Sequence, residues 1–262
     1  MISNHKTEPS ARVVTASQPL VDALLSMNTD NRKMREGIIC VYMREIEQGE
    51  FVLTNQGVGV DCDGILTDGQ HRLEAIKRCG YPPVQFVLVE GLSKKAKEKV
   101  DQHAKRSSRD MFKMFTENKD VCNLAPAICR MLLRDEKHAG FKPTFTEIYE
   151  KYEELETEIK SVLSAERGDR FFAAAHMAAF VWCVNKFPDK KESIIEMHDR
   201  AVIGANLDRS EPAFLLRNFC LTHRGASAGT QVQWERFYKT LKAIYTHIEG
   251  QTLGVLRATD PR

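Results

Sequence analysis

A dense group of hydrogen-bonding residues stands at one predicted turn of the chain. Residues 63–76 read DGILTDGQHRLEAI, in which an alternating, strand-like stretch leads into a turn and then a helix. The residues at the turn that could do chemistry are Asp68, Gly69, Gln70, His71 and Arg72. The start of a helix presents unpaired backbone N–H groups and a partial positive charge, so it favours an anion.

Two residues of this turn fit an anion further. Gly69 would let a ligand approach the backbone closely, and the guanidinium of Arg72 has a fork of donors suited to a phosphate. The residues therefore predict a phosphate or carboxylate site. A purely local interpretation stays open, in which Asp68 is a helix cap, Gly69 a turn residue and Arg72 a solvated charge.

His71 and the nearby acids each allow two roles. His71 could be a general acid or base, since the imidazole pKa lies near neutrality, or a hydrogen-bonded residue that positions the turn. Asp63 and Asp68, with Asp61, could hold Mg²⁺ beside a phosphate. Acids at this spacing are also common turn formers, so no metal site is assigned.

The sequence Asp-Gly-Gln-His-Arg-Leu-x-Ala resembles the signature of the ParB/sulfiredoxin superfamily, in the DGQHR branch found in phages and mobile elements. The resemblance covers about residues 12–115 and includes the Asn-Thr-Asp-Asn-Arg segment at residues 28–32. It implies that the helix start holds nucleotide phosphates, in a cleft formed with Asn31 and Arg32. It also implies an N-terminal α+β domain with a small mixed sheet.

Two departures from the family pattern narrow this expectation. Gln70 stands where sulfiredoxin has its reactive cysteine, so reduction of a sulfinic acid is not expected. A single arginine, Arg72, follows His71, so the paired-arginine box of the CTP-using ParB clamp is incomplete. The phosphate-binding geometry carries over, and the cofactor stays open between nucleotides such as ATP or CTP, with or without Mg²⁺.

A basic segment forms a second candidate site. Residues 94–113 contain eight Lys or Arg and three Asp or Glu. The residues with the most pointed pattern are Lys105, Arg106, Ser107 and Arg109. They could contact the phosphates of DNA or of another nucleic acid, which lysine and arginine do without reading sequence. The alternative is a solvated helix face.

Composition sets limits on the protein class. The 262 residues carry a net charge of +2, so any nucleic-acid surface must come from local clustering of charge. Seven cysteines without a Cys-x-x-Cys pair predict free thiols rather than a zinc site, which fits a cytoplasmic protein. The sequence shows no signal peptide and no run of about 18 apolar residues, so we expect no membrane association.

Periodicity divides the chain into two parts. Residues 12–115 alternate predicted helices with short strands, and residues 1–12 read as a flexible start. The predicted helices are 18–27, 33–48, 70–78 and 93–102, and the predicted strands are 51–53, 57–61, 65–67 and 84–89. Residues 116–262 have helical periodicity and predict an all-α domain of five or six helices. Its helix starts include a capping box at residues 144–147, Asp169 before a helix over 170–187, and Pro212.

The most favoured function is that of a nucleotide-binding or DNA-binding ParB-like protein in a phage or mobile-element DNA transaction. One alternative is a phosphotransferase or nuclease that uses His71 and an acid at the DGQHR site. The other is a non-catalytic adaptor, in which the helical domain supplies the surface for a protein partner. The sequence leaves the oligomeric state open.

Overall fold

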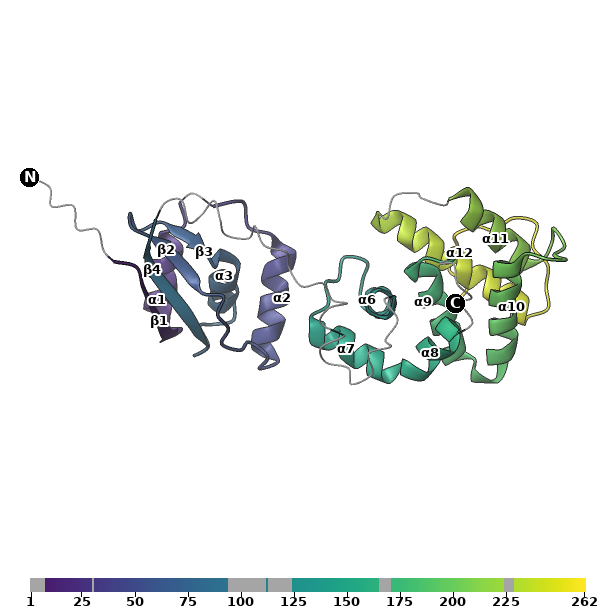
Figure 1. Cartoon of the computed structure of the whole chain (residues 1–262), viewed down its shortest axis with the longest axis horizontal. Helices are drawn as coiled ribbons and strands as arrows, with labels where there is room; N and C mark the ends of the chain where they lie inside the picture. Colours follow the sequence, from purple (N-terminus) through teal and green to yellow (C-terminus); the bar gives the residue numbers. More distant parts are fainter. Residues whose placement is uncertain (1–7, 30, 94–111, 113–123, 165–170, 224–228) are drawn as a thin grey trace, which may run out of the picture. The chain divides into compact units, whose positions relative to one another are not determined.

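The structure is a computed structural model that describes residues 8–29, 31–93, 112, 124–164, 171–223 and 229–262. The chain divides into two compact units, Met1–Lys105 and Arg106–Arg262 (Figure 1). The first contains a small mixed sheet with helices, and the described part of the second is helical. The α+β class with a helical C-terminal region is therefore confirmed.

The sheet of the first unit has four strands. They are β1 (Ser10–Thr15), β2 (Val58–Asp61), β3 (Leu66–Asp68) and β4 (Gln85–Leu92). Their order is β1-β4-β2-β3, with antiparallel pairs at both edges and a parallel β4–β2 pair in the centre. Gly59 lies opposite Asp68 across the β2–β3 pair, so the end of β3 is fixed beside β2.

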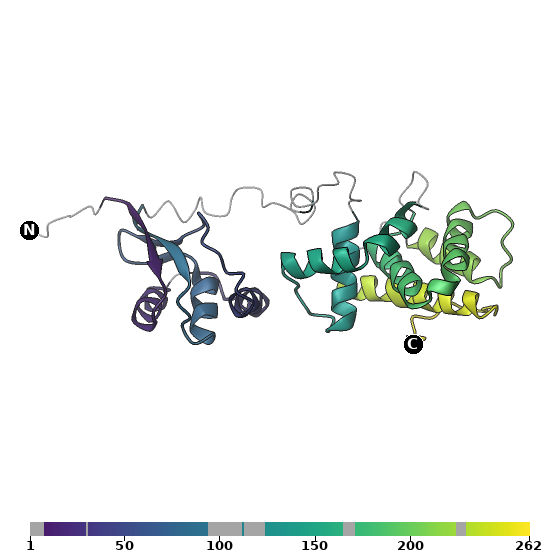
Figure 2. The same ribbon diagram turned by 90° about the horizontal axis from the view of Figure 1, so that it is seen from below.

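Three helices lie on one side of this sheet (Figure 2). They are α1 (Gln18–Ser26), α2 (Glu36–Glu47) and α3 (Gln70–Arg78). Helix α3 contacts both α1 and α2. Its apolar residues Leu73 and Ile76 are fully buried in a core that includes Val60 and Leu88 of the sheet. This burial fixes the direction in which the first turn of α3 faces.

The β2–β3 hairpin and the helix after it follow the sequence prediction closely. Helix α3 has the predicted bounds, and the hairpin turn is held by Asp61, whose Oδ1 accepts from the backbone N–H groups of Asp63 (2.9 Å) and Ile65 (2.8 Å). Asp61 is thus a turn former here, as one of the two interpretations expected.

Two predictions in the first unit are wrong. Residues 10–12, expected to be a flexible start, belong to β1, where Ala11 pairs with Val89 of β4. Residues 51–53, expected to be a strand, form none: the N–H of Phe51 bonds to the carbonyl of Glu45 at the end of α2 (3.0 Å), and Val52 is 68% exposed. A strand needs a neighbour, which local β propensity does not supply. Apart from Ser93, the predicted helix 93–102 lies outside the described residues.

The described part of the second unit contains seven α-helices, more than the five or six predicted. They are α6 (Ala125–Glu136), α7 (Phe145–Glu154), α8 (Glu156–Ser164), α9 (Ala174–Lys186), α10 (Lys191–Ile203), α11 (Pro212–Thr222) and α12 (Thr230–Ile248), with a short 3-10 turn, η1 (Pro188–Lys190). Helix α9 is buried nearly all round and contacts α6, α8, α10 and α12. It forms the centre of this unit's core.

The helix starts in this unit agree with the sequence signals in two cases. Thr144 and Glu147 form the predicted capping box, and Pro212 occupies the start of α11. The helix predicted over 170–187 begins later, at Ala174, because Ala173 is extended and Phe172 packs its ring against Phe180 instead of entering the helix. Asp169 lies outside the described residues.

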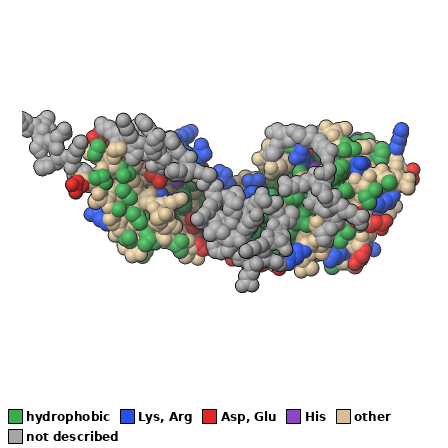
Figure 3. Space-filling model, in the orientation of Figure 1, with side chains coloured by type: hydrophobic (Ala, Val, Ile, Leu, Met, Phe, Trp, Pro, Cys, Tyr) green, Lys and Arg blue, Asp and Glu red, His purple; other side chains and the backbone are tan. Residues whose placement is uncertain are grey.

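The surface and the thiols are unremarkable for a globular protein. Acidic and basic side chains are interspersed over the described surface that Figure 3 shows. Cysteines in the described residues are free, and burial raises the pKa of Cys129 and of Cys220 to about 12. Among the described helices, none is both long enough and apolar enough to span a membrane.

His176 has a structural role in the core of the second unit. It is 3% exposed, and its Nδ1 lies 2.8 Å from the hydroxyl oxygen of Thr240 on α12. That hydroxyl donates to the carbonyl of Arg236, so Nδ1 carries the proton and donates to Thr240. Nε2 is then an acceptor that faces the Cys220 thiol at 3.7 Å. Burial, aided by the charge of Arg236, lowers the pKa of His176 to about 3.

The buried His176 should make the second unit less stable in mild acid. Between pH 6.5 and about 3 the unfolded chain binds a proton that the native histidine does not, so stability is full above pH 6.5 and falls as pH drops. The slope should reach about 1.4 kcal/mol per pH unit. Urea unfolding followed by the fluorescence of Trp182 and Trp234, the two tryptophans of the chain, measures this unit selectively.

The matched variant is His176→Asn, which keeps a donor near the Nδ1 position but does not titrate. We expect a flatter dependence of its unfolding free energy on pH between 6.5 and 5. An unchanged slope would assign the acid sensitivity to other groups.

Candidate functional site

Helix α3 begins at a glycine that no other residue can replace without strain. Gly69 is the N-cap, with φ at 98°, in the left-handed region that favours glycine. A Cβ at this position would lie 2.8 Å from Cγ2 and 3.2 Å from Cα of Val58 on the neighbouring strand. The Gly69 N–H donates to Oδ1 of Asp68 at 2.6 Å. The close approach of the turn to β2 therefore explains Gly69 by packing.

The first residue of the helix fastens a loop that is distant in sequence. The Gln70 side chain is buried at 5% exposure; its Nε2 donates to the carbonyl of Arg32 at 3.0 Å, and its Oε1 accepts from Nδ2 of Asn28 at 3.2 Å. Asn31 completes the attachment, since its Nδ2 donates to the carbonyl of Leu66 on β3 at 2.6 Å. The structure thus brings Asn31 and Arg32 to the start of α3.

His71 joins the same loop through one ring nitrogen. Its Nε2 accepts the backbone N–H of Arg35 at 3.0 Å, so the neutral ring carries its proton on Nδ1. Burial and the charges of Arg32 and Arg35 lower the pKa of His71, whereas Asp68 acts in the opposite direction. The imidazole is therefore neutral at pH 7, and the bond to Arg35 favours the positioning role over the acid–base role.

The guanidinium of Arg72 faces protein acceptors. It donates to the carbonyls of Gln56 and of Gly57 (2.7 Å for Gly57), and to Oδ2 of Asp68 at 3.2 Å. The side chain is 12% exposed. The guanidinium of Arg72, which was predicted to bind a phosphate, instead holds the 56–57 loop against the start of α3. We call this contact the Arg72 clamp.

The remaining predicted residues divide into two groups. Asp63 lies in the hairpin turn next to Asp61, and the described residues contain no group of three or more His, Cys, Asp or Glu that could hold a metal ion. Lys105, Arg106, Ser107 and Arg109 lie outside the described residues.

Sequence reasoning missed the contributions of Arg35 and of the carbonyls of Gln56 and Gly57. The basic run from Arg32 to Arg35, directly before a helix, was the available signal for the first. Backbone carbonyls leave no signal in side-chain identity, so nothing in the sequence indicated the second.

Replacing Gly69 with Ala should destabilise the first unit by about 1–3 kcal/mol, the cost of a residue held in an unfavourable backbone conformation, with added strain against Val58. Gly64→Ala is the matched control, because Gly64 also has a positive φ (79°) but has nothing within 4 Å of an added Cβ. Urea unfolding followed by circular dichroism should show a larger loss for Gly69→Ala. Equal losses would show that contact with Val58 contributes nothing.

Replacing Arg72 with Ala should also lower the unfolding free energy of the first unit, by about 1.5–3 kcal/mol, because partly buried acceptors lose a charged donor. The transition seen by tryptophan fluorescence reports on the second unit and serves as the internal reference. If circular dichroism shows no loss, the clamp on Gln56 and Gly57 does not stabilise the fold.

Comparisons of the chain with protein-family models, with curated proteins and with solved structures find no match in any of the three. The resemblance of residues 68–75 to the ParB/sulfiredoxin signature therefore stays a prediction, and the functional argument depends on the geometry of the start of α3.

Proposed function

We propose that the first unit is a ParB/sulfiredoxin-like domain that binds a phosphate of a nucleotide or nucleic acid at the first turn of α3. The observation that carries this proposal is the set of backbone N–H groups of Gln70, His71 and Arg72. Within the described residues, none of the three has an acceptor, and the turn has no side-chain cap. A helix start that is partly buried and leaves such donors open is suited to an anion.

The side chains of the turn support this proposal because they bond to neighbouring loops and not to the N–H groups of residues 70–72. Gln70 and His71 hold the loop of residues 28–35, and Arg72 holds the 56–57 loop. These bonds fix the orientation of the turn while leaving its main chain open. In this arrangement the side chains position the turn, and the backbone amides bind the ligand. A different side chain at one of these positions is therefore compatible with binding of the same anion.

The local charge favours an anion as well. Arg32 and Arg35 carry exposed positive charges close enough to His71 to lower its pKa. His71 itself is neutral at pH 7 and adds no charge. The Asp68 carboxylate, 43% exposed, opposes a ligand unless Arg72 and the Gly69 N–H continue to neutralise it. This balance of charges around the turn supports a phosphate ligand. Together with the resemblance of the motif, it leads us to infer a role in a phage or mobile-element DNA transaction.

Binding should be visible at the turn itself. On titration of the full chain with ATP, CTP or a short single-stranded oligonucleotide, the backbone amide resonances of Gln70, His71 and Arg72 should shift in ¹⁵N–¹H spectra. Amides of α10, a helix of the second unit, serve as the reference for unspecific effects. Arg32→Gln and Arg35→Gln should each weaken binding by about 1 kcal/mol, the order of one solvent-exposed charge interaction.

Arg12→Gln is the matched control, because Arg12 lies on β1 and pairs with Glu90 away from the turn. It should leave the affinity unchanged. If none of these ligands shifts the three amides, the phosphate-binding proposal fails and the adaptor alternative gains weight. If hydrolysis accompanies binding, the enzyme alternative replaces simple binding.

A further inference from the structure

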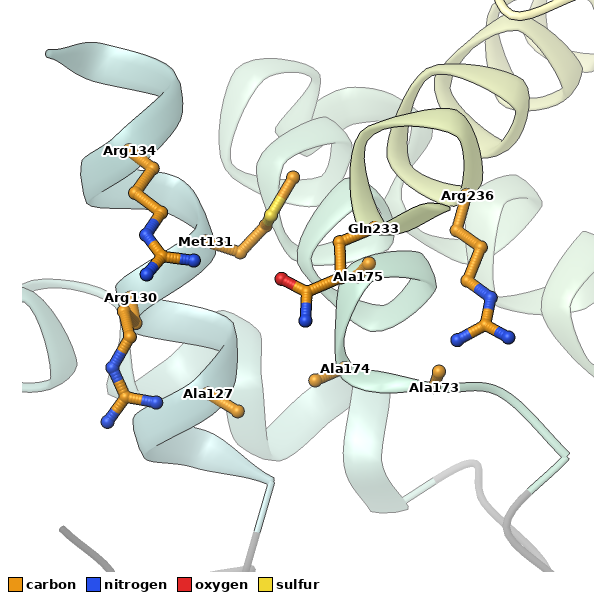
Figure 4. Close-up of a pocket in the computed structure, with 9 residues that line it drawn as sticks. All are labelled: Ala127, Arg130, Met131, Arg134, Ala173, Ala174, Ala175, Gln233 and Arg236. Atoms are coloured by element: carbon orange, nitrogen blue, oxygen red, sulfur yellow. The ribbon is translucent and has the colours of Figure 1, made fainter. Parts of the chain in front are cut away.

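The second unit contains a cavity of about 370 Å³ whose lining is basic (Figure 4). It lies among three helices: α6, the start of α9, and α12. The lining residues are Ala127, Arg130, Met131, Arg134, Ala173, Ala174, Ala175, Gln233 and Arg236. The size is within the range of small-molecule sites. Among the described residues, the lining contains three arginines and no aspartate or glutamate.

Two of the three arginines, Arg134 and Arg236, keep donors available for a ligand. Arg134 donates through Nε to the carbonyl of Phe141 at 3.1 Å, and Arg236 donates to the carbonyl of His223 at 3.3 Å. Neither forms an ion pair with another described residue. A guanidinium has five N–H donors, so most of the donors of Arg134 and Arg236 have no acceptor within the described parts of the chain. Arg130 is half-buried, and burial together with the charge of Arg134 lowers its pKa, which reflects positive charges crowded together.

The start of α9 adds backbone donors to this lining. Its cap, Ala173, has no side-chain acceptor, and the N–H groups of Ala174 and Ala175 have no acceptor among the described residues. The alanine side chains are small, so they leave the main chain accessible. The partial positive charge of a 13-residue helix is therefore directed at a cavity that arginines already line.

The placement of these groups indicates how many charges the ligand has. Figure 4 shows Arg130 and Arg134 together on α6, with Arg236 on the far side of Gln233. Two linked anionic groups match arginines that lie on two sides of one cavity. The buried bond from His176 to Thr240 ties the start of α9 to α12, which fixes these two sides of the cavity against each other.

We propose that this cavity binds a small molecule with at least two phosphate groups, such as a nucleoside diphosphate or another diphosphate ester. Arginine forks match phosphate oxygens in pairs, and the backbone N–H groups of α9 supply further donors. The site is distinct from the start of α3 and does not depend on the function proposed for it.

Inorganic pyrophosphate is the probe, added to the full-length chain. It should raise the melting temperature of the transition seen by tryptophan fluorescence, and orthophosphate should bind more weakly. Arg134→Gln and Arg236→Gln should each weaken pyrophosphate binding in calorimetry by about tenfold or more, as expected when a charge-assisted hydrogen bond is lost. Arg209→Gln, at an exposed arginine outside the cavity, and Arg32→Gln, in the first unit, should leave it unchanged.

Gln233→Glu separates a binding role from a structural one. A carboxylate at this position should abolish pyrophosphate binding and raise the melting temperature of the ligand-free protein, since it neutralises the arginines. No stabilisation of the parent by pyrophosphate would overturn the proposal, as would equal affinities for the parent and both arginine variants. Binding of a single-stranded oligonucleotide without binding of pyrophosphate would also overturn it, because the ligand would then be a macromolecule.

Discussion

The first turn of α3 organises the first unit because its polar side chains bond to backbone groups that are far away in sequence. Gln70 reaches the carbonyl of Arg32, His71 accepts the N–H of Arg35, and Arg72 donates to the carbonyls of Gln56 and Gly57. Loops expose backbone donors and acceptors that need partners when they are partly buried. One helical turn therefore supplies hydrogen-bond partners for backbone groups of two loops and determines where each loop can lie.

This arrangement has a consequence for how the turn can act on a ligand. The side chains that suggest chemistry in the sequence are committed to protein groups, so the unpaired backbone N–H groups of residues 70–72 are what the turn can offer. The loop also brings the exposed guanidinium groups of Arg32 and Arg35 close to the turn, and their charge makes the electrostatic potential there positive. The residues of the turn thus fix its conformation, and the arginines of the attached loop supply the positive charge.

The arginines of the second unit fall into two groups that differ in their partners. Arg217 donates to the carbonyls of Ala201 (2.7 Å) and Val202, and Arg262 pairs with Asp135 and Asp260, so these charges are neutralised or bonded within the protein. Arg134 and Arg236 each bond to one carbonyl and line a cavity to which the described residues contribute no carboxylate. Like charges at a cavity raise the free energy of the empty protein, and an anion lowers it. That contrast distinguishes the cavity from the surrounding surface.

The sequence determined those features whose causes are local. The apolar stripe of α3, the hairpin turn at Asp61, the capping box at Thr144 and the proline at the start of α11 all follow from contacts within a few residues. These depend on periodicity and on short-range hydrogen bonds, which residue order fixes.

Tertiary structure decided the rest, because it depends on which distant segments meet. The edge strand β1 exists through its pairing with β4, whereas Phe51 and Val52 have strand-forming side chains but no strand beside them. Arg72 has the residue type of a phosphate ligand, and only the approach of the 56–57 loop makes it a clamp. Arg130 and Arg236 lie on helices far apart in sequence, and packing around α9 brings them to one cavity.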